Sequence, residues 1–575
     1  MSKKIFLITT LLVILLITQF SSIIYAATID TSRTASLTII EYENAHGEGM
    51  DSSENKPLSG VELTIYKLDD ANFNKDAKQL EQDILEGSIT LNSQSLTTQN
   101  DGKVIFTNLA LGRYLVVQTN SPINVNVKME SFLIDLPRTS DDGLSWNYDV
   151  TVEPKNVTVY GDVLFTKTTD NNQALQGTTW ELQIKKSEDV WEKYDYNETL
   201  TTNKDGQISL KNLPAGSYRL VETSAPAQYI LDSTNVKEFT ISAENTSHTI
   251  SAINETVNIE KQVKVSNEYV KSVGAYLTDT VKWKVSANVP TIINKMETYS
   301  FTDKLPSELD FNSNSFEVHA KIGNTDNTLV LNQDYSLNQT DNPEGKFLHV
   351  TFTPSNLSGY DMVYFTYETS YNSSVKYGQA IINGACIEYT NNIDINGNCL
   401  STHTSDYNNA EVHTGSLVIL KTDSDNNPLQ GAKFKISETK EKANNNEYIK
   451  DADGNDLIST SNENGLVVFY GLKYGADGNS AQTAFSNYYI TEVESPTYTE
   501  NGEVKHYNLL ADSVEVTVNS TSGEKNSNTP QIINKKGFIL PITGATGTIT
   551  LILIGSILII VAKKRNNKND KEQVQ

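Results

Sequence analysis

A lysine, a glutamate and an asparagine recur in the same order in two separate stretches of this chain. The two sets are Lys167, Glu222 and Asn254, and then Lys421, Glu492 and Asn534. Each Lys precedes a Leu-Gln-Gly turn, and each Glu stands midway between a Tyr and a Pro. An uncharged Lys amine is a nucleophile, a protonated Glu donates a hydrogen bond, and an Asn side chain offers a carbonyl carbon to attack. The repeated set therefore has the parts needed to form an amide bond.

Strand alternation places these side chains on apolar faces. Lys167 alternates with apolar residues along 163–167, Glu222 does so along 218–222, and Asn254 along 250–254. Since successive side chains of a strand point to opposite faces, each polar group shares a face with apolar neighbours and is expected to point inward. Burying a lone charge is costly, so the groups must pair or shift their pKa values.

The expected chemistry is a single amide-forming step. A buried Lys becomes a neutral amine, and a buried Glu becomes protonated and polarises the Asn carbonyl. Attack then releases ammonia and leaves a Lys–Asn amide between the first and last strands. The alternative is a buried Lys–Glu salt bridge beside an uninvolved Asn. This pattern resembles the intramolecular isopeptide domains of Gram-positive pilins and collagen adhesins, the CnaB-like modules, over 158–256 and 413–536.

The region between them, 257–412, carries a related set. Lys261, Asp303 and Asn383 each lie in a strand-like stretch in which apolar and polar residues alternate. Asp303 falls within the segment Phe-Thr-Asp-Lys-Leu-Pro. This set resembles the CnaA-like variant of the isopeptide domain, in which Asp replaces Glu. A satisfied polar core is the alternative, and Asn391 or Asn392 remains an alternative acceptor.

The first domain, 28–157, lacks the same chemistry. Glu41 occupies the strand position of the Lys, and Gln118 occupies the position of the Glu. We expect a related sandwich without a cross-link. Because neither of its ends is tied covalently, this domain is expected to be the least stable and the most mobile.

A second lysine motif ends this domain, from Trp146 to Asn156. It resembles the pilin motif WxxxVxVxPKN, with Glu153 where Tyr is common. Parity here places Lys155 outward, and the adjacent Pro154 predicts a backbone unencumbered by sheet pairing. An exposed amine is what an external enzyme requires, whereas the bland alternative is one solvated surface lysine among many.

The C-terminus indicates which class of external enzyme would use this amine. The pentapeptide Leu540, Pro541, Ile542, Thr543 and Gly544 precedes an apolar run over 545–562 and a Lys-Lys-Arg cluster. A run of this length is just able to span a bilayer, and the basic cluster marks its cytoplasmic side. The arrangement resembles an LPxTG-type sortase sorting signal, which is cut between Thr and Gly so that the Thr carboxyl passes to an amine.

The N-terminus predicts export. Lys3 and Lys4 precede an apolar run over 5–20, and small residues follow at Ala26 and Ala27, where cleavage is expected. An uncleaved N-terminal anchor is the alternative. In an oxidising compartment the two cysteines, Cys386 and Cys399, are expected to form a disulfide, two free thiols being the alternative.

Composition agrees with an exported β-rich chain. The net charge of −25 argues against nucleic acid as a partner. Alternating apolar and polar runs recur, and helical periodicity outside the terminal segments is confined to 78–86. The fold class is therefore all-β, in an elongated multidomain chain with a signal peptide and a C-terminal transmembrane helix. The resemblance implies that its domains are tandem immunoglobulin-like β-sandwiches of CnaB and CnaA type, arranged as a rod.

The expected domain order follows. It is a signal peptide over 1–27, an N-terminal pilin domain with the acceptor lysine over 28–157, a CnaB-like domain over 158–256, a CnaA-like domain with the disulfide over 257–412, a CnaB-like domain over 413–536, and the sorting signal, transmembrane helix and basic tail over 537–575.

The resemblance implies a major shaft subunit of a covalent pilus, joined head to tail by a Thr543–Lys155 bond between subunits. Its implied partners are identical subunits, pilin-type and housekeeping sortases, minor pilins, peptidoglycan and host surface ligands. The implied location is the cell wall and surface pilus, after transient membrane anchoring. We expect no turnover enzyme, cofactor or metal site. The alternatives are a wall-anchored adhesin and a basal or tip pilin.

Overall fold

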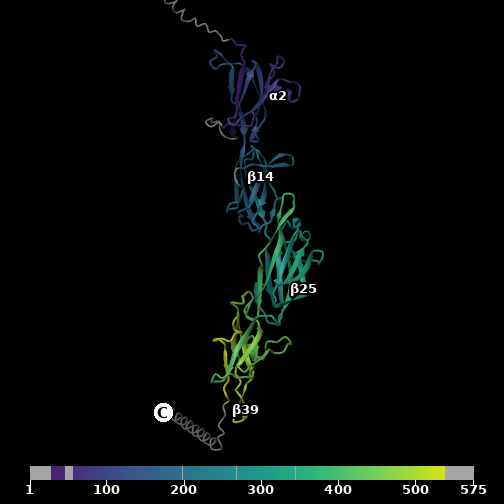
Figure 1. Ribbon diagram of the computed structural model, residues 1–575, viewed down its shortest axis with the longest axis vertical. Coiled ribbons are helices and arrows are strands. Elements are labelled where there is room, and N and C mark those ends of the chain that lie inside the picture. Colours follow the sequence, from purple (N-terminus) through teal and green to yellow (C-terminus); the bar gives the residue numbers. More distant parts are fainter. Residues whose placement is uncertain (1–27, 46–55, 197–198, 267, 344, 538–575) are drawn as a thin grey trace, which may run out of the picture. The chain divides into compact units, whose positions relative to one another are not determined.

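The structure, a computed structural model, describes residues 28–45, 56–196, 199–266, 268–343 and 345–537. Within these residues strands predominate, and the α-helices are the short segments α2 (Ala77–Leu85) and α3 (Lys440–Asn444) (Figure 1). The all-β prediction is confirmed. The helix expected over 78–86 is α2, whose N-cap Asp76 accepts a hydrogen bond from the backbone nitrogen of Gln79.

The chain divides into two compact units. One ends at Thr256 and also takes in Asn391–Ser401, and the other comprises Val257–Thr390 and the residues from Thr402 onward. Each unit contains two β-sandwiches, so the tandem arrangement of sandwiches expected from the sequence is also confirmed.

The first sandwich has three sheets and a two-stranded ribbon. Its strands are β1 (Ala35–Ile40), β5 (Lys103–Leu109) and β11 (Asp149–Val152); β3 (Glu62–Lys67), β4 (Ser93–Thr97), β6 (Gly112–Asn120) and β8 (Phe132–Leu136); β2 (Tyr42–Ala45), β7 (Val125–Val127) and β12 (Lys155–Thr158); and the ribbon β9 (Arg138–Thr139) with β10 (Trp146–Asn147).

The second sandwich has a three-stranded sheet and a four-stranded sheet. Its strands are β13 (Tyr160–Thr169), β16 (Gln207–Pro214) and β20 (Ser247–Asn254); β14 (Thr179–Ser187), β15 (Val190–Lys193), β17 (Gly216–Ser224) and β19 (Lys237–Ile241); and the short β18 (Leu231–Asp232).

The third sandwich is larger, with a five-stranded sheet facing an eight-stranded one. The five-stranded sheet contains β21 (Ile259–Lys264), β23 (Val281–Asn288), β25 (Leu309–Ile322), β26 (Thr325–Thr328) and β29 (Met362–Tyr371). The other contains β22 (Ser272–Gly274), β24 (Tyr299–Leu305), β27 (Tyr335–Asn342), β28 (Gly345–Phe352), β30 (Ile381–Ile393), β31 (Cys399–Thr404) and β32 (Asn408–His413), with β18 pairing β30.

The fourth sandwich again has a three-stranded and a four-stranded sheet. Its strands are β33 (Gly415–Thr422), β36 (Leu466–Leu472) and β41 (Gln531–Ile533); β34 (Lys433–Ser437), β35 (Ile458–Thr460), β37 (Phe485–Glu494) and β40 (Val514–Asn519); and the ribbon β38 (Thr497–Glu500) with β39 (Glu503–His506).

The first, second and fourth sandwiches share one topology. In each, the first strand of the small sheet lies between an antiparallel neighbour and the last strand, which pairs with it in parallel. The parallel pairs are β1 with β11, β13 with β20, and β33 with β41. The two ends of each sandwich therefore lie side by side.

Alternation along the strands builds the cores. Along β13 the buried residues Val163, Phe165 and Lys167 alternate with more exposed ones. Val163 and Phe165 pack in one cluster with Leu182 and Tyr218 of the facing sheet. The apolar positions thus close the two sheets together, and the lysine is carried into the same layer.

The terminal predictions fall outside the described residues. These are the signal peptide over 1–27, the sorting signal over 540–544 and the membrane segment over 545–562. In the part of the chain that the structure describes, no helix is both long enough and apolar enough to cross a membrane.

One glycine turn supports each of the strands that carry the repeated motif. Gly206 has a φ of 72°, its carbonyl accepts from the backbone nitrogen of Lys167, and a Cβ at Gly206 would collide with the carbonyl oxygen of Lys167. Gly102 and Gly465 make the same approach to Glu41 and Lys421. The same glycine turn therefore holds the backbone at Glu41, Lys167 and Lys421 in the three sandwiches.

We predict that Gly206→Ala destabilises the second sandwich more than Gly177→Ala does. Both glycines have positive φ, but a Cβ at Gly177 meets nothing within 4 Å. Gly177→Ala should cost about 1 kcal/mol of unfolding free energy through backbone strain. Gly206→Ala should cost about 2 kcal/mol more through the collision. Denaturant titration of the two variants measures the difference, and equal losses would contradict the assigned role of Gly206.

Candidate functional site: buried Lys, carboxylate and Asn triads

The first triad lies between the sheets of the second sandwich. Lys167 Nζ donates to Glu222 Oε2 at 3.0 Å and to Asn254 Oδ1 at 2.6 Å. Asn254 Nδ2 donates to Glu222 Oε1 at 2.8 Å. Each side chain is thus bonded to the other two, and all three are buried.

Strand register explains why these residues meet. β13 and β20 are parallel neighbours with Lys167 opposite Ala252, so Asn254 projects from the same face one alternation further along. Glu222 comes from β17 of the facing sheet. The three residues predicted from the repeated pattern are therefore brought together.

Burial sets the protonation of this triad. Desolvation lowers the pKa of Lys167, although the charge of Glu222 opposes the shift. Desolvation likewise raises the pKa of Glu222, and the charge of Lys167 opposes that shift. Because the two pKa values move toward each other, transfer of one proton from Lys to Glu costs far less than in water. The product of that transfer is a neutral amine held against an amide.

The second triad repeats this arrangement in the fourth sandwich. Lys421 Nζ donates to Asn534 Oδ1 and lies 3.6 Å from Glu492 Oε1, while Asn534 Nδ2 donates to Glu492 Oε1 at 2.8 Å. The backbone nitrogen of Leu510 donates to Glu492 Oε2 at 3.0 Å. Desolvation lowers the pKa of Lys421 to about 8, against the opposing charge of Glu492. An uncharged amine is therefore accessible near neutral pH.

The third set, in the third sandwich, has a different geometry. Lys261 Nζ forms an ion pair with Asp303 Oδ2, and both side chains are fully buried. Tyr367, from β29, completes the cluster: its hydroxyl accepts from Lys261 Nζ at 2.8 Å and from Asn383 Nδ2 at 2.7 Å. The pattern analysis missed Tyr367, although it alternates with the apolar Val363 and Phe365 on the inward face of its strand.

Desolvation also shifts the pKa values of the third set. It lowers the pKa of Lys261 to about 8 and raises the pKa of Asp303, and in each case the charge of the other residue opposes the shift. The oxygens Asp303 Oδ1 and Asn383 Oδ1 are buried and have no hydrogen-bond partner within the described structure. A protonated Asp303 carries the donor that these two acceptors lack.

Asn383 is connected to Lys261 through Tyr367, whose hydroxyl accepts from both side chains. It faces inward from β30, and Asp303 on the adjacent β24 is paired with the nearby Ala385. The alternatives make other contacts: Asn391 Nδ2 donates to the backbone oxygen of Ala227, and Asn392 pairs with Leu231.

The first sandwich holds Glu41, Gln118 and Asn156 at the corresponding places. Asn156 Nδ2 donates to Glu41 Oε2 at 2.7 Å. The backbone nitrogen of Met129 donates both to Gln118 Oε1 at 3.0 Å and to Asn156 Oδ1 at 3.2 Å. This frame matches the other triads but has a carboxyl in place of the amine, so it lacks a nucleophile for Asn156.

Lys155 begins β12, immediately before the buried Asn156. The expectation that its backbone is free of sheet pairing is wrong, because Lys155 pairs with Tyr42 of the parallel strand β2. Pro154 separates β11 from β12, but the chain re-enters a ladder at once. The side chain of Lys155 lies outside the described residues, so its exposure stays a prediction.

The disulfide expected between Cys386 and Cys399 is absent: both are thiols in the structure, Cys386 buried and Cys399 half-buried. Hairpin register explains the difference. Asp394 bonds to Asn398 at the turn, so Cys399 lies next to the turn, whereas Cys386 lies near the middle of β30. Each strand residue adds about 3.3 Å to the distance along the hairpin. Disulfide-linked Cα atoms lie within about 7 Å of each other, so Cys386 is too far along β30 to reach Cys399.

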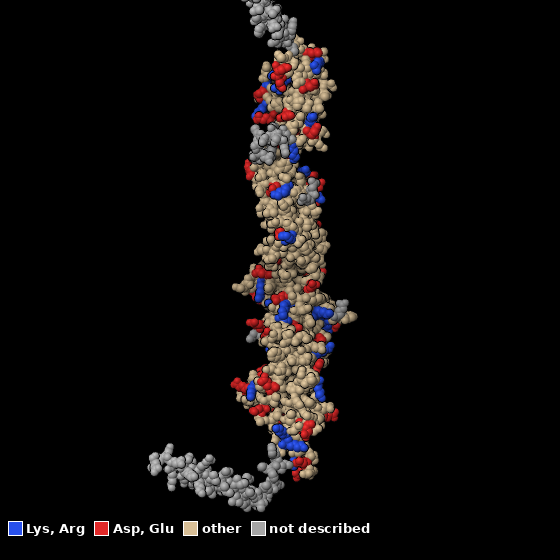
Figure 2. Space-filling view, turned by 90° about the vertical axis from the view of Figure 1, so that its left-hand side faces the viewer, with Lys and Arg blue, Asp and Glu red and all other residues tan. Residues whose placement is uncertain are grey.

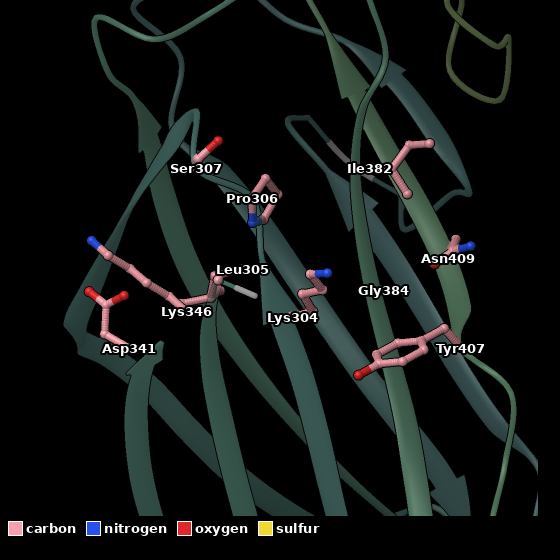
Figure 3. A pocket seen from close by; sticks show the side chains of 11 residues that line it. Lys304, Leu305, Pro306, Ser307, Asp341, Lys346, Ile382, Gly384, Tyr407 and Asn409 are labelled. Carbon is pink, nitrogen blue, oxygen red and sulfur yellow. The ribbon is translucent and has the colours of Figure 1, made fainter. Parts of the chain in front are cut away.

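The described surface also carries pockets. One of about 510 Å³ lies on the third sandwich, and its polar side chains come from Lys304, Ser307, Asp341, Lys346, Tyr407 and Asn409 (Figure 3). The described residues contain no cluster of metal-binding side chains. On the face shown in Figure 2, acidic and basic side chains are interspersed among uncharged ones. These features define no reaction, so the buried triads remain the sites with assignable chemistry.

Family comparisons agree with the sandwiches and their order. Residues 34–157 match the Gram-positive pilin subunit D1, N-terminal domain, and residues 161–256 and 415–530 match the SpaA prealbumin-like fold domain. This chain belongs to the Gram-positive pilins. The matched pilin domain ends on the Lys155-containing motif, and the two prealbumin-like matches include Lys167 and Lys421 together with their Glu partners.

Curated relatives are fimbrial subunits. The fimbrial subunit type 1 of Actinomyces viscosus is 33% identical over 147 residues, which is 23% of this chain and 27% of that protein. The fimbrial subunit type 2 of Actinomyces naeslundii is 24% identical over 236 residues, or 34% of this chain and 43% of that protein. The pilin chain thus spans less than half the length of the curated relatives it matches.

Solved structures of other pilins are similar in part. The major pilin subunit BcpA of Bacillus cereus has 23% identity and a TM-score of 0.40, covering 66% of this chain and 99% of that one. The major pilin SpaD of Corynebacterium diphtheriae has 20% identity and a TM-score of 0.35, covering 89% of this chain and 99% of that one.

We predict that the first sandwich loses stability as pH rises. Desolvation raises the pKa of Glu41 from 4.5 to about 7, and the hydrogen bond from Asn156 opposes the shift. The pKa of Glu41 is higher in the folded state than in the unfolded state. The stability that protonated Glu41 contributes is therefore complete below pH 4.5 and is lost as pH rises through about 7. Opening free energies should fall by roughly 2 kcal/mol between pH 5 and pH 8.

Hydrogen exchange of the β1 and β5 amides in the intact secreted chain measures this, after correction for the pH dependence of intrinsic exchange. Glu41→Gln should remove the pH dependence. Glu43→Gln is the matched control, because Glu43 belongs to the same sandwich but forms an ion pair with Lys56. An unchanged pH dependence in Glu41→Gln would refute the assignment.

Proposed function

We propose that this pilin is the shaft subunit of a covalent surface fibre and that its buried triads form intramolecular Lys–Asn isopeptide bonds. The observation that carries the proposal is the pair of matching triads, each with a buried amine bonded to the side-chain oxygen of a buried Asn. Each triad joins a first strand to the last strand of its sandwich. A covalent tie at that point would carry tension from one end of a sandwich to the other without loading its hydrogen bonds.

The bond-forming step needs no outside reagent. After proton transfer to Glu222, the Lys167 amine attacks the side-chain carbon of Asn254. The new carbon–nitrogen bond forms as the bond to Nδ2 breaks, one proton moves from Nζ to Nδ2, and ammonia leaves. The carboxyl group, within hydrogen-bond distance of both nitrogens, is suited to move that proton. Lys421, Glu492 and Asn534 would react in the same way.

Polymerisation would use the ends of the chain. A pilin-type sortase would cleave the sorting signal between Thr543 and Gly544 and hold the Thr543 carboxyl as a thioester. The Lys155 amine of the next subunit would resolve it as an amide. A contact between two different surfaces does not close on itself, so repetition gives a fibre. The last transfer, by a housekeeping sortase, would fix the fibre to peptidoglycan, with minor pilins as further partners.

The intact mass of the secreted chain tests the internal bonds. Each Lys–Asn bond removes one ammonia, about 17 Da. We expect a deficit of three ammonias under reducing conditions, one for each set containing Lys167, Lys261 and Lys421. A deficit of two would retire the pair Lys261–Asn383, and an unchanged mass would refute all the internal bonds and leave buried salt bridges.

The Lys155→Arg variant tests the bond between subunits. Arginine keeps the charge but does not act as an amine nucleophile. Co-expression with a pilin-type sortase should give a ladder of boiling-resistant polymers with the unaltered chain and monomer alone with Lys155→Arg. The control is Lys128→Arg, an exposed lysine of the same sandwich, which should polymerise normally. A full ladder from Lys155→Arg would exclude Lys155 as the acceptor.

A further inference from the structure

The three triads solve one chemical problem with different groups. In amide formation the attacking nitrogen must lose a proton and the leaving nitrogen must gain one. In the second sandwich Glu222 touches both nitrogens, with Oε2 at 3.0 Å from Lys167 Nζ and Oε1 at 2.8 Å from Asn254 Nδ2. One carboxyl group therefore spans the path of the proton.

In the third sandwich the carboxylate is shorter by one methylene group. Asp303 pairs with Lys261, but Asn383 Nδ2 donates to the hydroxyl of Tyr367 at 2.7 Å. The same hydroxyl accepts from Lys261 Nζ at 2.8 Å and donates to Asp303 Oδ2 at 3.0 Å. Tyr367 thus connects the nucleophile, the acid and the leaving nitrogen.

The Tyr367 hydroxyl uses all its hydrogen-bonding capacity in this cluster. A phenol has one donor and two acceptor positions, and all three are filled. The side chain is fully buried, and its ring lies 4.8 Å from Lys261 Nζ. Desolvation raises the pKa of Tyr367 well above its ordinary value, so the group stays a phenol that can both give and take a proton.

We propose that Tyr367 is a catalytic residue that relays the proton from Lys261 to the leaving nitrogen of Asn383 during isopeptide formation in the third sandwich. The inference rests on the cross-link proposed above.

The step balances within the cluster. The neutral Lys261 amine attacks the side-chain carbon of Asn383, and the new carbon–nitrogen bond forms. Tyr367 passes its proton to Nδ2 and takes one from Nζ, so the phenol ends unchanged. The bond from carbon to Nδ2 breaks, and ammonia leaves. Protonated Asp303 polarises the carbonyl and ends the step as it began it.

The test compares Tyr367→Phe with Tyr371→Phe in the full secreted chain. Tyr371 is the matched control, because it lies on the same strand and its buried hydroxyl has no hydrogen-bond partner in the described structure. The readout is ammonia loss in the peptides containing Lys261 and Asn383, followed by mass spectrometry, with near-ultraviolet circular dichroism reporting on the fold.

We expect Tyr371→Phe to lose ammonia as the unaltered chain does and Tyr367→Phe to fold but form the bond at least tenfold more slowly. The double variant Y367F/D303E should restore the rate of bond formation, because a glutamate is long enough to reach both nitrogens, as Glu222 does. That recovery would distinguish a missing proton path from a damaged fold.

Equal rates in Tyr367→Phe and the unaltered chain would overturn the relay while leaving the cross-link intact. An unaltered chain that keeps its ammonia in these peptides would overturn the cross-link of the third sandwich and the relay with it.

Discussion

The desolvation of a lysine amine between two sheets is the constraint on which the described architecture depends. Lys167, Lys261 and Lys421 are all buried, and an isolated ammonium in that environment would cost several kcal/mol. The cost is acceptable only because polar groups are held against each amine: a carboxyl group and an Asn side chain at Lys167 and Lys421, and Asp303 with Tyr367 at Lys261. In the second and fourth sandwiches the topology supplies the Asn, since the parallel pairing of first and last strands aligns it with the Lys.

The same backbone frame tolerates different chemistry. Glu41 in the first sandwich has the backbone contacts of Lys167, including the close glycine carbonyl, yet it presents an acid to its Asn. The third sandwich has a different topology and an Asp in place of Glu. The Asp does not contact both the Lys and the Asn, and a tyrosine connects them instead. The identity of the central side chain therefore decides between a reactive cluster and a hydrogen-bonded one.

Alternation and repetition were sufficient to predict the sandwiches and to bring the Lys, Glu and Asn residues together, because strand parity follows directly from sequence. They did not identify Tyr367, whose hydroxyl is indistinguishable by pattern from that of any tyrosine on an apolar face. The disulfide failed because the spacing of two cysteines does not reveal where a hairpin turns. The pairing at Lys155 was missed because a proline interrupts one ladder without preventing the next.

The wide sequence separation within each triad has a further consequence. Lys167 and Asn254 are 87 residues apart, and Lys421 and Asn534 are 113 residues apart. Contacts of such long range form only after most of the intervening chain has closed its loops and packed. If the amine and amide react, they do so only in a sandwich that has completed its folding. Each ammonia released then reports one folded domain, and because the release is irreversible, the new bond prevents that domain from opening at its ends.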